Sequence, residues 1–437
     1  MRPPMLLAHG TSLEAALPIA PGVVAAAIGL VLVGVSALLL RVWTEPRWQD
    51  TVDAPEPGPT ERGPLGWVAA AVGLAVFVVV ISATFAGPEQ GDFNIATWTV
   101  FSLVWAGGLV LSGLLGDVYR PFDPLRTLSG TLPGDWGPDD APRGVVPATL
   151  LLAGFAWVEF VTPIPQTPRV LGGVLLGGLA VVYLPGLALG RGWVWGADPI
   201  ARLLSTLARS GPVHRDADGR LTVGAPLRRL PALRHVPGLT ALLLVALGAS
   251  LFDAMRDAEL YTALGTSLGF TVVEIPRWDQ VPFATGLLAV LVAVSGLAWR
   301  LAIRSAARDS GQDAAELSRS FTHVLVPLVI AFSIALSIGA LAIDLQRLWI
   351  LASDPFGRGW DLFGTSRGSI RLDLISATTA AWVQVASILA GGLAAVVLTH
   401  DRSVARFEGE TVQTAQTGLL VAIVFFTVGG MMLLLGT

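Results

Sequence analysis

The feature that most constrains this chain is a set of long apolar runs that contain no charged residue. Residues 23–40 and 419–436 are two such runs, each about 18 residues long. A helix of about 20 residues crosses the hydrocarbon core of a bilayer, which is about 30 Å thick. Only 14% of all residues are charged, against roughly one quarter in soluble domains. The pattern therefore predicts an integral membrane protein.

Ten apolar segments predict an all-α fold, a polytopic transmembrane helical bundle of about ten spans that forms one domain over residues 1–437. Nine or eleven spans remain alternatives, because the fourth segment contains Glu159 and runs into a proline-rich stretch. The expected spans are residues 17–41, 64–87, 95–116, 145–163, 169–190, 238–256, 281–303, 321–343, 373–399 and 416–436.

Arginine residues orient the predicted bundle, since basic residues are retained on the cytoplasmic side of a membrane. The connections after the first, third, fifth, seventh and ninth spans, counted with the span edges, hold 20 of the 28 basic residues. Both termini are therefore predicted to lie outside, and the lipid bilayer is the first expected partner.

Two of the inner connections are long. The linker 44–63 is polar and proline-rich, which predicts a flexible cytoplasmic connection. The basic cytoplasmic loop 191–236 contains residues 198–209, whose apolar side chains recur at the i, i+3, i+4, i+7 spacing of a helix. Asp198 suits the N-cap of this helix and Pro199 its first turn. We expect an amphipathic interfacial helix on the inner membrane surface or, as the alternative, a helix packed on the bundle.

Three acidic residues, Glu159, Asp253 and Asp344, fall near the outer ends of predicted spans. An ionisable group within a span costs several kcal/mol unless it is paired or hydrated, so each is a candidate functional residue. Together they predict a site for a cation, a metal or a transferred proton that opens to the exterior. The alternative is that each acid is solvated or pairs with an arginine, such as Arg256 or Arg347.

The outer segment 350–368, ILASDPFGRGWDLFGTSRG, adds Asp354, Trp360 and Asp361 to the candidate ligand-binding residues. Asp354 followed by a proline predicts a capped turn or short helix. Aromatic rings suit the headgroup layer, and the glycines permit tight turns. We expect the segment to lie in the outer interface or to dip back among the helices.

Two histidines form a second candidate site. His323 begins the eighth predicted span and His400 ends the ninth, so both are expected at the inner boundary. Neighbouring helices would allow this polar pair to share a proton or a metal ion. The alternative is that each histidine is an interfacial anchor at a helix end.

Several classes of chemistry find no support in the sequence. The chain has no cysteine, which excludes disulfides, thiolate metal sites and cysteine nucleophiles. Neither an HExxH nor a GxxxxGK[ST] motif occurs, so the zincin and P-loop signatures are missing. The net charge is −4 and no basic stripe carries interleaved aromatic residues, so nucleic acid is not an expected partner. No cofactor, bound metal or protein partner can be named.

The segment SDPFGRGWDLFGT at 353–365, preceded by FTHVLVPLVIAFSIALSI at 321–338, resembles polytopic bacterial membrane proteins labelled "fenitrothion hydrolase". Weaker similarity covers residues 94–128, 189–209 and 242–255. The resemblance implies a multi-pass protein of a prokaryotic plasma (inner) membrane and the hydrolysis of an organophosphate triester. In that family the helix after the LVP element carries two histidines three residues apart, where this chain has Ser333 and Leu336.

Three functions follow from these patterns. The first is binding or transport of a small solute or cation through the acidic outer site. The second is a membrane-embedded hydrolase, which needs a metal or a strong general base to activate water. The third is a non-catalytic membrane scaffold subunit. The absence of the two family histidines favours the first.

Overall fold

The computed structural model describes residues 18–48, 58–215, 220–273 and 276–435, and almost all of its regular structure is helical. Within these ranges, nine helical stretches are long and apolar enough to cross a membrane. They are α1 (Pro21–Val42), α2 (Pro64–Ala86), the stretch Ile95–Leu115, α7 (Pro168–Leu189), α10 (Leu239–Arg256), α12 (Val281–Ser310), the stretch Ala314–Ala352, α15 (Ala377–Arg406) and α16 (Thr411–Leu434).

A tenth apolar helix, α6 (Val146–Val161), is shorter, with 16 residues. It occupies the fourth predicted segment, so the order of the ten segments agrees with the sequence. The all-α bundle of about ten spans is thus confirmed. The main difference in boundaries lies at the eighth segment, where α14 (Leu325–Ala352) continues nine residues beyond the predicted end at 343.

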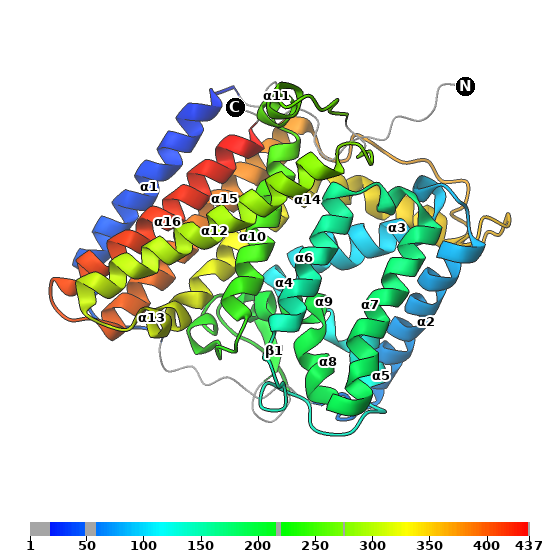
Figure 1. The fold of residues 1–437 in the computed structure, drawn as a ribbon, viewed down its shortest axis with the longest axis horizontal. Helices are drawn as coiled ribbons and strands as arrows, with labels where there is room; N and C mark the ends of the chain where they lie inside the picture. Colours follow the sequence, from blue (N-terminus) through cyan, green and yellow to red (C-terminus); the bar gives the residue numbers. More distant parts are fainter. Residues whose placement is uncertain (1–17, 49–57, 216–219, 274–275, 436–437) are drawn as a thin grey trace.

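Successive long helices run in opposite directions, and α1 begins at the same end of the bundle at which α16 ends (Figure 1). We call this the outer end, following the orientation predicted from the arginines. The short helix α11 (Glu259–Ser267) also lies there. At the opposite, inner end lie α5 (Pro124–Ser129), α8 (Arg191–Ala197), α9 (Pro199–Leu207) and α13 (Ala314–Phe321).

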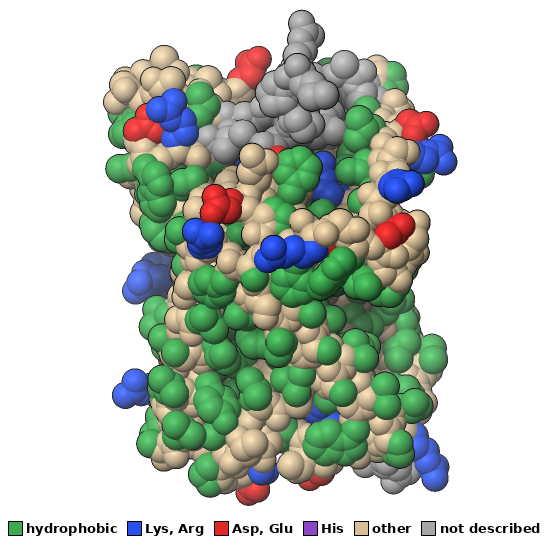
Figure 2. Space-filling model, turned by 90° about the vertical axis from the view of Figure 1, so that its right-hand side faces the viewer, with side chains coloured by type: hydrophobic (Ala, Val, Ile, Leu, Met, Phe, Trp, Pro, Cys, Tyr) green, Lys and Arg blue, Asp and Glu red, His purple; other side chains and the backbone are tan. Residues whose placement is uncertain are grey.

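The centre of the bundle is formed by α10 and α14. Two thirds of the apolar window of each is buried, against 22% for α2, α7 and α12. The peripheral helices instead expose large apolar side chains, such as Leu30 and Leu150. On the face shown in Figure 2, a broad and mostly hydrophobic zone separates acidic side chains at its two ends. Such a surface requires contact with lipid rather than water.

The helical stretch Ile95–Leu115 changes its hydrogen-bonding pattern along its length. It begins as α3 (Ile95–Thr97), continues as the ten-residue π-helix η3 (Trp98–Gly107) and ends as α4 (Gly108–Leu115). π-Helical turns are rare and are frequently found at functional sites. Short 3₁₀ helices occupy η2 (Gly91–Phe93), η4 (Arg120–Phe122), η5 (Ile164–Gln166), η6 (Ala208–Ser210), η7 (Leu230–Ala232) and η8 (Thr322–Val324).

The basic loop 191–236 folds against the inner end of the bundle. Its helix α9 begins at Pro199, and the Asp198 side chain accepts a hydrogen bond from the Ala201 N–H at 2.9 Å, as an N-cap does. Leu203 and Leu207 of α9 are fully buried in the main hydrophobic core. Thus the apolar face of α9 packs on protein, which is the second of the two alternatives. A two-stranded antiparallel hairpin follows, β1 (Val213–Arg215) and β2 (Leu221–Val223).

The linker 44–63 is attached to the bundle at both of its described ends, while residues 49–57 lie outside the described residues. The Arg47 N–H donates to Asp401 Oδ1 at 2.6 Å, and Arg62 Nη1 donates to Thr127 Oγ1 at 3.0 Å. Helix α2, which follows the linker, packs closely on η4: a Cβ on Gly73 would lie 1.8 Å from the Phe122 carbonyl oxygen. Only glycine therefore fits where α2 meets η4.

Candidate functional site

The most deeply buried of the predicted acids is Asp344, which lies in the membrane-spanning helix α14. Its side chain is 7% exposed, and Asp344 Oδ2 accepts a hydrogen bond from Ser102 Oγ at 2.7 Å. Ser102 itself is 4% exposed and lies in the middle of the π-helix η3. A hydrogen bond to a charged group contributes about 1.5–3 kcal/mol. The structure therefore joins a buried carboxylate to a rare backbone conformation inside the bundle.

A second set of polar groups continues from Asp344 toward the outer end. Arg347 lies one helical turn further along α14, and its Cζ lies 4.3 Å from the centroid of the Trp98 ring. The indole N–H of Trp98 donates to the Asp92 carbonyl oxygen at 3.1 Å. Burial raises the pKa of the Asp92 side chain, while the charge of Arg347 opposes that rise. Asp92, Arg347 and Asp344 therefore form a sequence of alternating charges from the outer loop into the bundle.

Glu159 and Asp253 are brought together by the packing of α6 on α10. Glu159 is half-buried, and its Oε2 atom has no hydrogen-bond partner in the described part of the chain. The Glu159 carboxyl group interacts electrostatically with Asp253 and Arg256 of α10. Arg256 Nη1 also donates to the Phe160 carbonyl oxygen at 3.0 Å, which ties the end of α6 to α10. The two acids thus lie close to each other and to Arg256.

Asp344 belongs to a different helix pair from this acidic couple. It lies where α14 meets η3, whereas Glu159 and Asp253 lie where α6 meets α10. Phe155 of α6 packs against the π-helix, with its ring 5.0 Å from that of Trp105. A single site formed by all three acids remains a prediction.

The outer segment 353–368 is held by hydrogen bonds between its own carboxylate side chains and its own backbone N–H groups. Asp354 Oδ1 accepts from the Arg358 N–H at 2.8 Å and Oδ2 from the Gly359 N–H at 2.6 Å. Asp361 Oδ1 likewise accepts from the Ser366 N–H at 3.0 Å, and this hydrogen bond lowers the pKa of Asp361. Both carboxylates therefore stabilise turns of the loop. Their role as ligands for a solute stays a prediction.

Aromatic residues of this loop lie at its surface. Trp360 is 46% exposed and packs edge-on against Phe356, while Trp349 stacks on Phe363 with ring centroids 5.7 Å apart. Gly357 has a φ of +65° and lies against Pro88, beyond the end of α2. The exposed rings suit the headgroup layer, as the sequence predicts.

His400 is held at the inner end by two other helices. Its Nε2 donates to the Trp43 carbonyl oxygen at 2.8 Å, and its Nδ1 lies 3.1 Å from Gln416 Oε1. His323 is 3% exposed, and its Nε2 has no hydrogen-bond partner within the described ranges. The His323 ring interacts electrostatically with the guanidinium group of Arg402. The two rings lie at the same end of the packed helices α14 and α15, and a shared site remains a prediction.

Sequence analysis missed a buried charge cluster at the inner end. Asp123 and Asp198 cap α5 and α9, and their exposed fractions are 1% and 2%. The Cζ atoms of Arg126 and Arg202 lie 5.8 and 5.9 Å from the centroid of the Trp136 ring. The repeated pattern of Asp-Pro followed by an arginine, in FDPLR and ADPIAR, is a signal that marks both halves. Only tertiary packing shows that the halves meet.

The cluster also shifts the acid–base behaviour of its members. Burial raises the pKa of Asp123 to about 8, with a further contribution from the charge of Asp198, while Arg126 and Arg202 oppose the rise. Burial likewise raises the pKa of Asp198. Asp123 therefore keeps its proton near neutral pH in the folded protein.

Two further observations bear on hydrolytic chemistry. No three histidine, cysteine, aspartate or glutamate side chains in the described part of the chain lie close enough to hold a metal ion. A GxSxG pattern, GTSLG, occurs at 265–269, but it lies at the end of helix α11 rather than at a strand-to-helix turn. There Ser267 Oγ donates to the Leu264 carbonyl oxygen at 2.8 Å.

Comparison with known proteins gives no relative: no protein-family model, no curated protein and no solved structure matches this chain.

The buried cluster predicts that the stability of the folded protein depends on pH, and that Asp123→Asn weakens this dependence. Asp123 has a folded pKa of about 8 against an ordinary value of 3.8, so the folded state holds a proton that the unfolded state releases. Its stabilising contribution is present below about pH 4 and falls as the pH rises to about 8. Asp123→Asn keeps an N-cap acceptor but cannot ionise, so its unfolding midpoint should fall less between pH 5 and pH 8 than that of the wild type.

Thermal unfolding of the purified protein in detergent measures this difference. Asp313→Asn is the matched control, since Asp313 caps α13 in the same way but is exposed. The control should follow the wild-type slope. Parallel curves for the wild type and Asp123→Asn would show that Asp123 does not titrate in this range.

Proposed function

We propose that this multi-span membrane protein binds or transports a small solute or cation, with Asp344 as the central carboxylate. The observation that carries the proposal is the buried hydrogen bond between Asp344 and Ser102 of the π-helix η3. Ionisable side chains inside a membrane are expensive and usually mark a pathway for an ion, a proton or a substrate.

The surroundings of Asp344 support this proposal in two ways. The sequence of charges from Asp92 through Arg347 offers a polar approach from the outer end. The π-helix adds a second element, because a local change between π- and α-helical hydrogen bonding would move Ser102 relative to Asp344. A cation or a proton bound at Asp344 would neutralise the carboxylate and change the strength of that hydrogen bond.

Flux into proteoliposomes tests the proposal with defined probes. The probes are protons, followed with an internal pH-sensitive dye under an imposed potential, and Na⁺ and Mg²⁺. Wild-type protein should conduct at least one of these above protein-free vesicles. Asp344→Asn should lower that flux by at least about tenfold, because it removes the charge and the charge-assisted hydrogen bond. Ser102→Ala should lower it less.

Asp373→Asn is the control, since Asp373 is an exposed acid of an outer loop that pairs with Arg371. It should conduct as the wild type does. Equal flux in the wild type and Asp344→Asn, with equal amounts of inserted protein, would refute the role given to Asp344.

The resemblance to the proteins labelled "fenitrothion hydrolase" supports a second proposal, a membrane hydrolase. The unpaired Nε2 of buried His323 is the observation that favours it, since this nitrogen is positioned to accept a proton. His323 and the loop that begins at Ser353 lie at opposite ends of α14, which has 28 residues and is therefore about 42 Å long. A hydrolytic site would thus involve His323 without the loop.

Cleavage of a chromogenic phosphotriester by the purified protein tests this second proposal. Activity should fall by roughly two orders of magnitude in His323→Ala, the usual contribution of a general base. His214→Ala, in the inner hairpin strand β1, should leave it unchanged. Absence of cleavage by the wild type would eliminate the hydrolase, and activity that His323→Ala retains would eliminate His323 as its general base.

A further inference from the structure

The helix α12 is longer than the membrane that it crosses. Its 30 residues extend about 45 Å, whereas the hydrocarbon core is about 30 Å thick. Arg300 lies about 30 Å along the axis from Val281 at the outer end. The part of α12 from Arg300 onward, which also carries Arg304 and Arg308, therefore lies at and beyond the inner membrane boundary.

The exposed face of α12 changes character at this boundary. Val290, Leu297 and Leu301 are 54%, 54% and 55% exposed and follow one another at helical spacing on the outward side. Arg300 and Arg304 continue the same exposed face toward the inner end. This face could therefore match an anionic phospholipid along its length. Its apolar part would contact the acyl chains, and its basic part would contact the phosphate.

A groove opens between α12 and α13 at the level of these two arginines. It has a volume of about 300 Å³. Trp299 Nε1 donates to Ser318 Oγ at 3.1 Å across its base, which fixes the separation of the two helices. The lining residues are Trp299, Arg300, Ile303, Arg304, Ala314, Ala315 and Ser318.

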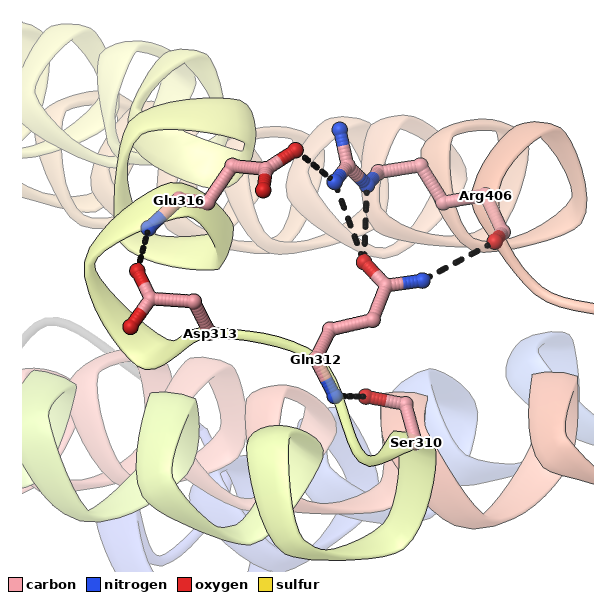
Figure 3. Close-up of polar contacts among 5 residues, drawn as sticks. All are labelled: Ser310, Gln312, Asp313, Glu316 and Arg406. Carbon is pink, nitrogen blue, oxygen red and sulfur yellow. Dashed lines mark hydrogen bonds and ion pairs between the residues drawn. The ribbon is translucent and has the colours of Figure 1, made fainter.

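The turn that connects α12 to α13 is held by α15 (Figure 3). Arg406 donates from Nε and Nη2 to Gln312 Oε1, at 3.2 and 3.0 Å, and also pairs with Glu316. Asp313 Oδ1 accepts from the Glu316 N–H at 2.9 Å, as the N-cap of α13. Asp313 and Glu316 are thus both engaged in contacts that hold the turn.

The groove is therefore positively charged. The side chains of Arg300 and Arg304 form no hydrogen bond or ion pair with any residue that the structure describes. A guanidinium group presents donors that match two oxygens of a phosphate. Anionic lipids also concentrate at the cytoplasmic leaflet, where they attract basic residues.

We propose that the α12–α13 groove binds the phosphate of an anionic phospholipid of the inner leaflet. Arg300 and Arg304 contact the phosphate, Trp299 and Ser318 form the floor, and the acyl chains lie along Leu297 and the apolar residues above it. A lipid fits this place better than a soluble anion does, because the basic groove is continuous with the lipid-facing stripe of α12.

Native mass spectrometry of the full chain tests the proposal. The protein is released from nanodiscs that contain equal amounts of phosphatidylglycerol and phosphatidylcholine. The wild type should retain phosphatidylglycerol preferentially. The double variant Arg300→Gln/Arg304→Gln should lose roughly 30-fold in apparent affinity for it, the combined effect of two interfacial basic residues. Arg308→Gln, one turn beyond the groove on the same helix, should retain most of the affinity.

A second variant, Ala315→Trp, fills the groove and leaves both arginines in place, so it covers the case in which the double variant does not fold. It should also lose phosphatidylglycerol. Equal retention of the two lipids by the wild type would overturn the proposal, as would unchanged retention in both variants. Displacement of phosphatidylglycerol by millimolar inorganic phosphate would overturn it too, because the site would then bind a soluble anion.

Discussion

Hydrocarbon offers no hydrogen-bond partner, and most of this structure follows from that constraint. Backbone N–H and C=O groups inside the membrane have to be satisfied by the protein itself, and an α-helix does so within its own segment. Charged side chains are restricted to the helix ends or to internal partners for the same reason. Asp344 illustrates the second solution, since it lies within the bundle and accepts a hydrogen bond from Ser102. Arg300 and Arg304 illustrate the first, at the end of α12.

The two ends of the bundle meet this constraint in different ways. At the outer end the acids of the 353–368 loop accept hydrogen bonds from nearby backbone N–H groups, so the charges stabilise a compact turn beside exposed aromatic rings. At the inner end Asp123 and Asp198 are buried with arginines and Trp136, which joins α5 and α9 to the bundle. The proposed path to Asp344 and the proposed lipid site therefore lie at different depths and on different helices, and each can be tested without the other.

Sequence patterns predicted the spans because apolar length is a property of each segment alone. They also predicted the cap at Asp198 and the turn at Asp354, which depend on neighbouring residues only. They could not predict Ser102 as the partner of Asp344, 242 positions away along the chain. The meeting of Asp123 with Asp198 could not be predicted for the same reason, since it depends on packing between distant segments. The apolar pattern of residues 98–107 also did not distinguish a π-helix from an α-helix. The residue pattern of α9 indicated a helix, but its burial became evident only from the contacts with α4 and α6.

The central claim is tested most directly by determining on which side of the membrane each end of the bundle lies. The chain has no cysteine, so single cysteines can be introduced without background at two exposed positions, Leu372 in the outer loop and Val223 in strand β2. A membrane-impermeant maleimide should label Leu372→Cys in intact cells and Val223→Cys only after the membrane is opened. Labelling of Val223→Cys in intact cells, or protection of Leu372→Cys there, would contradict the orientation and with it the outward path to Asp344 and the inner-leaflet lipid site.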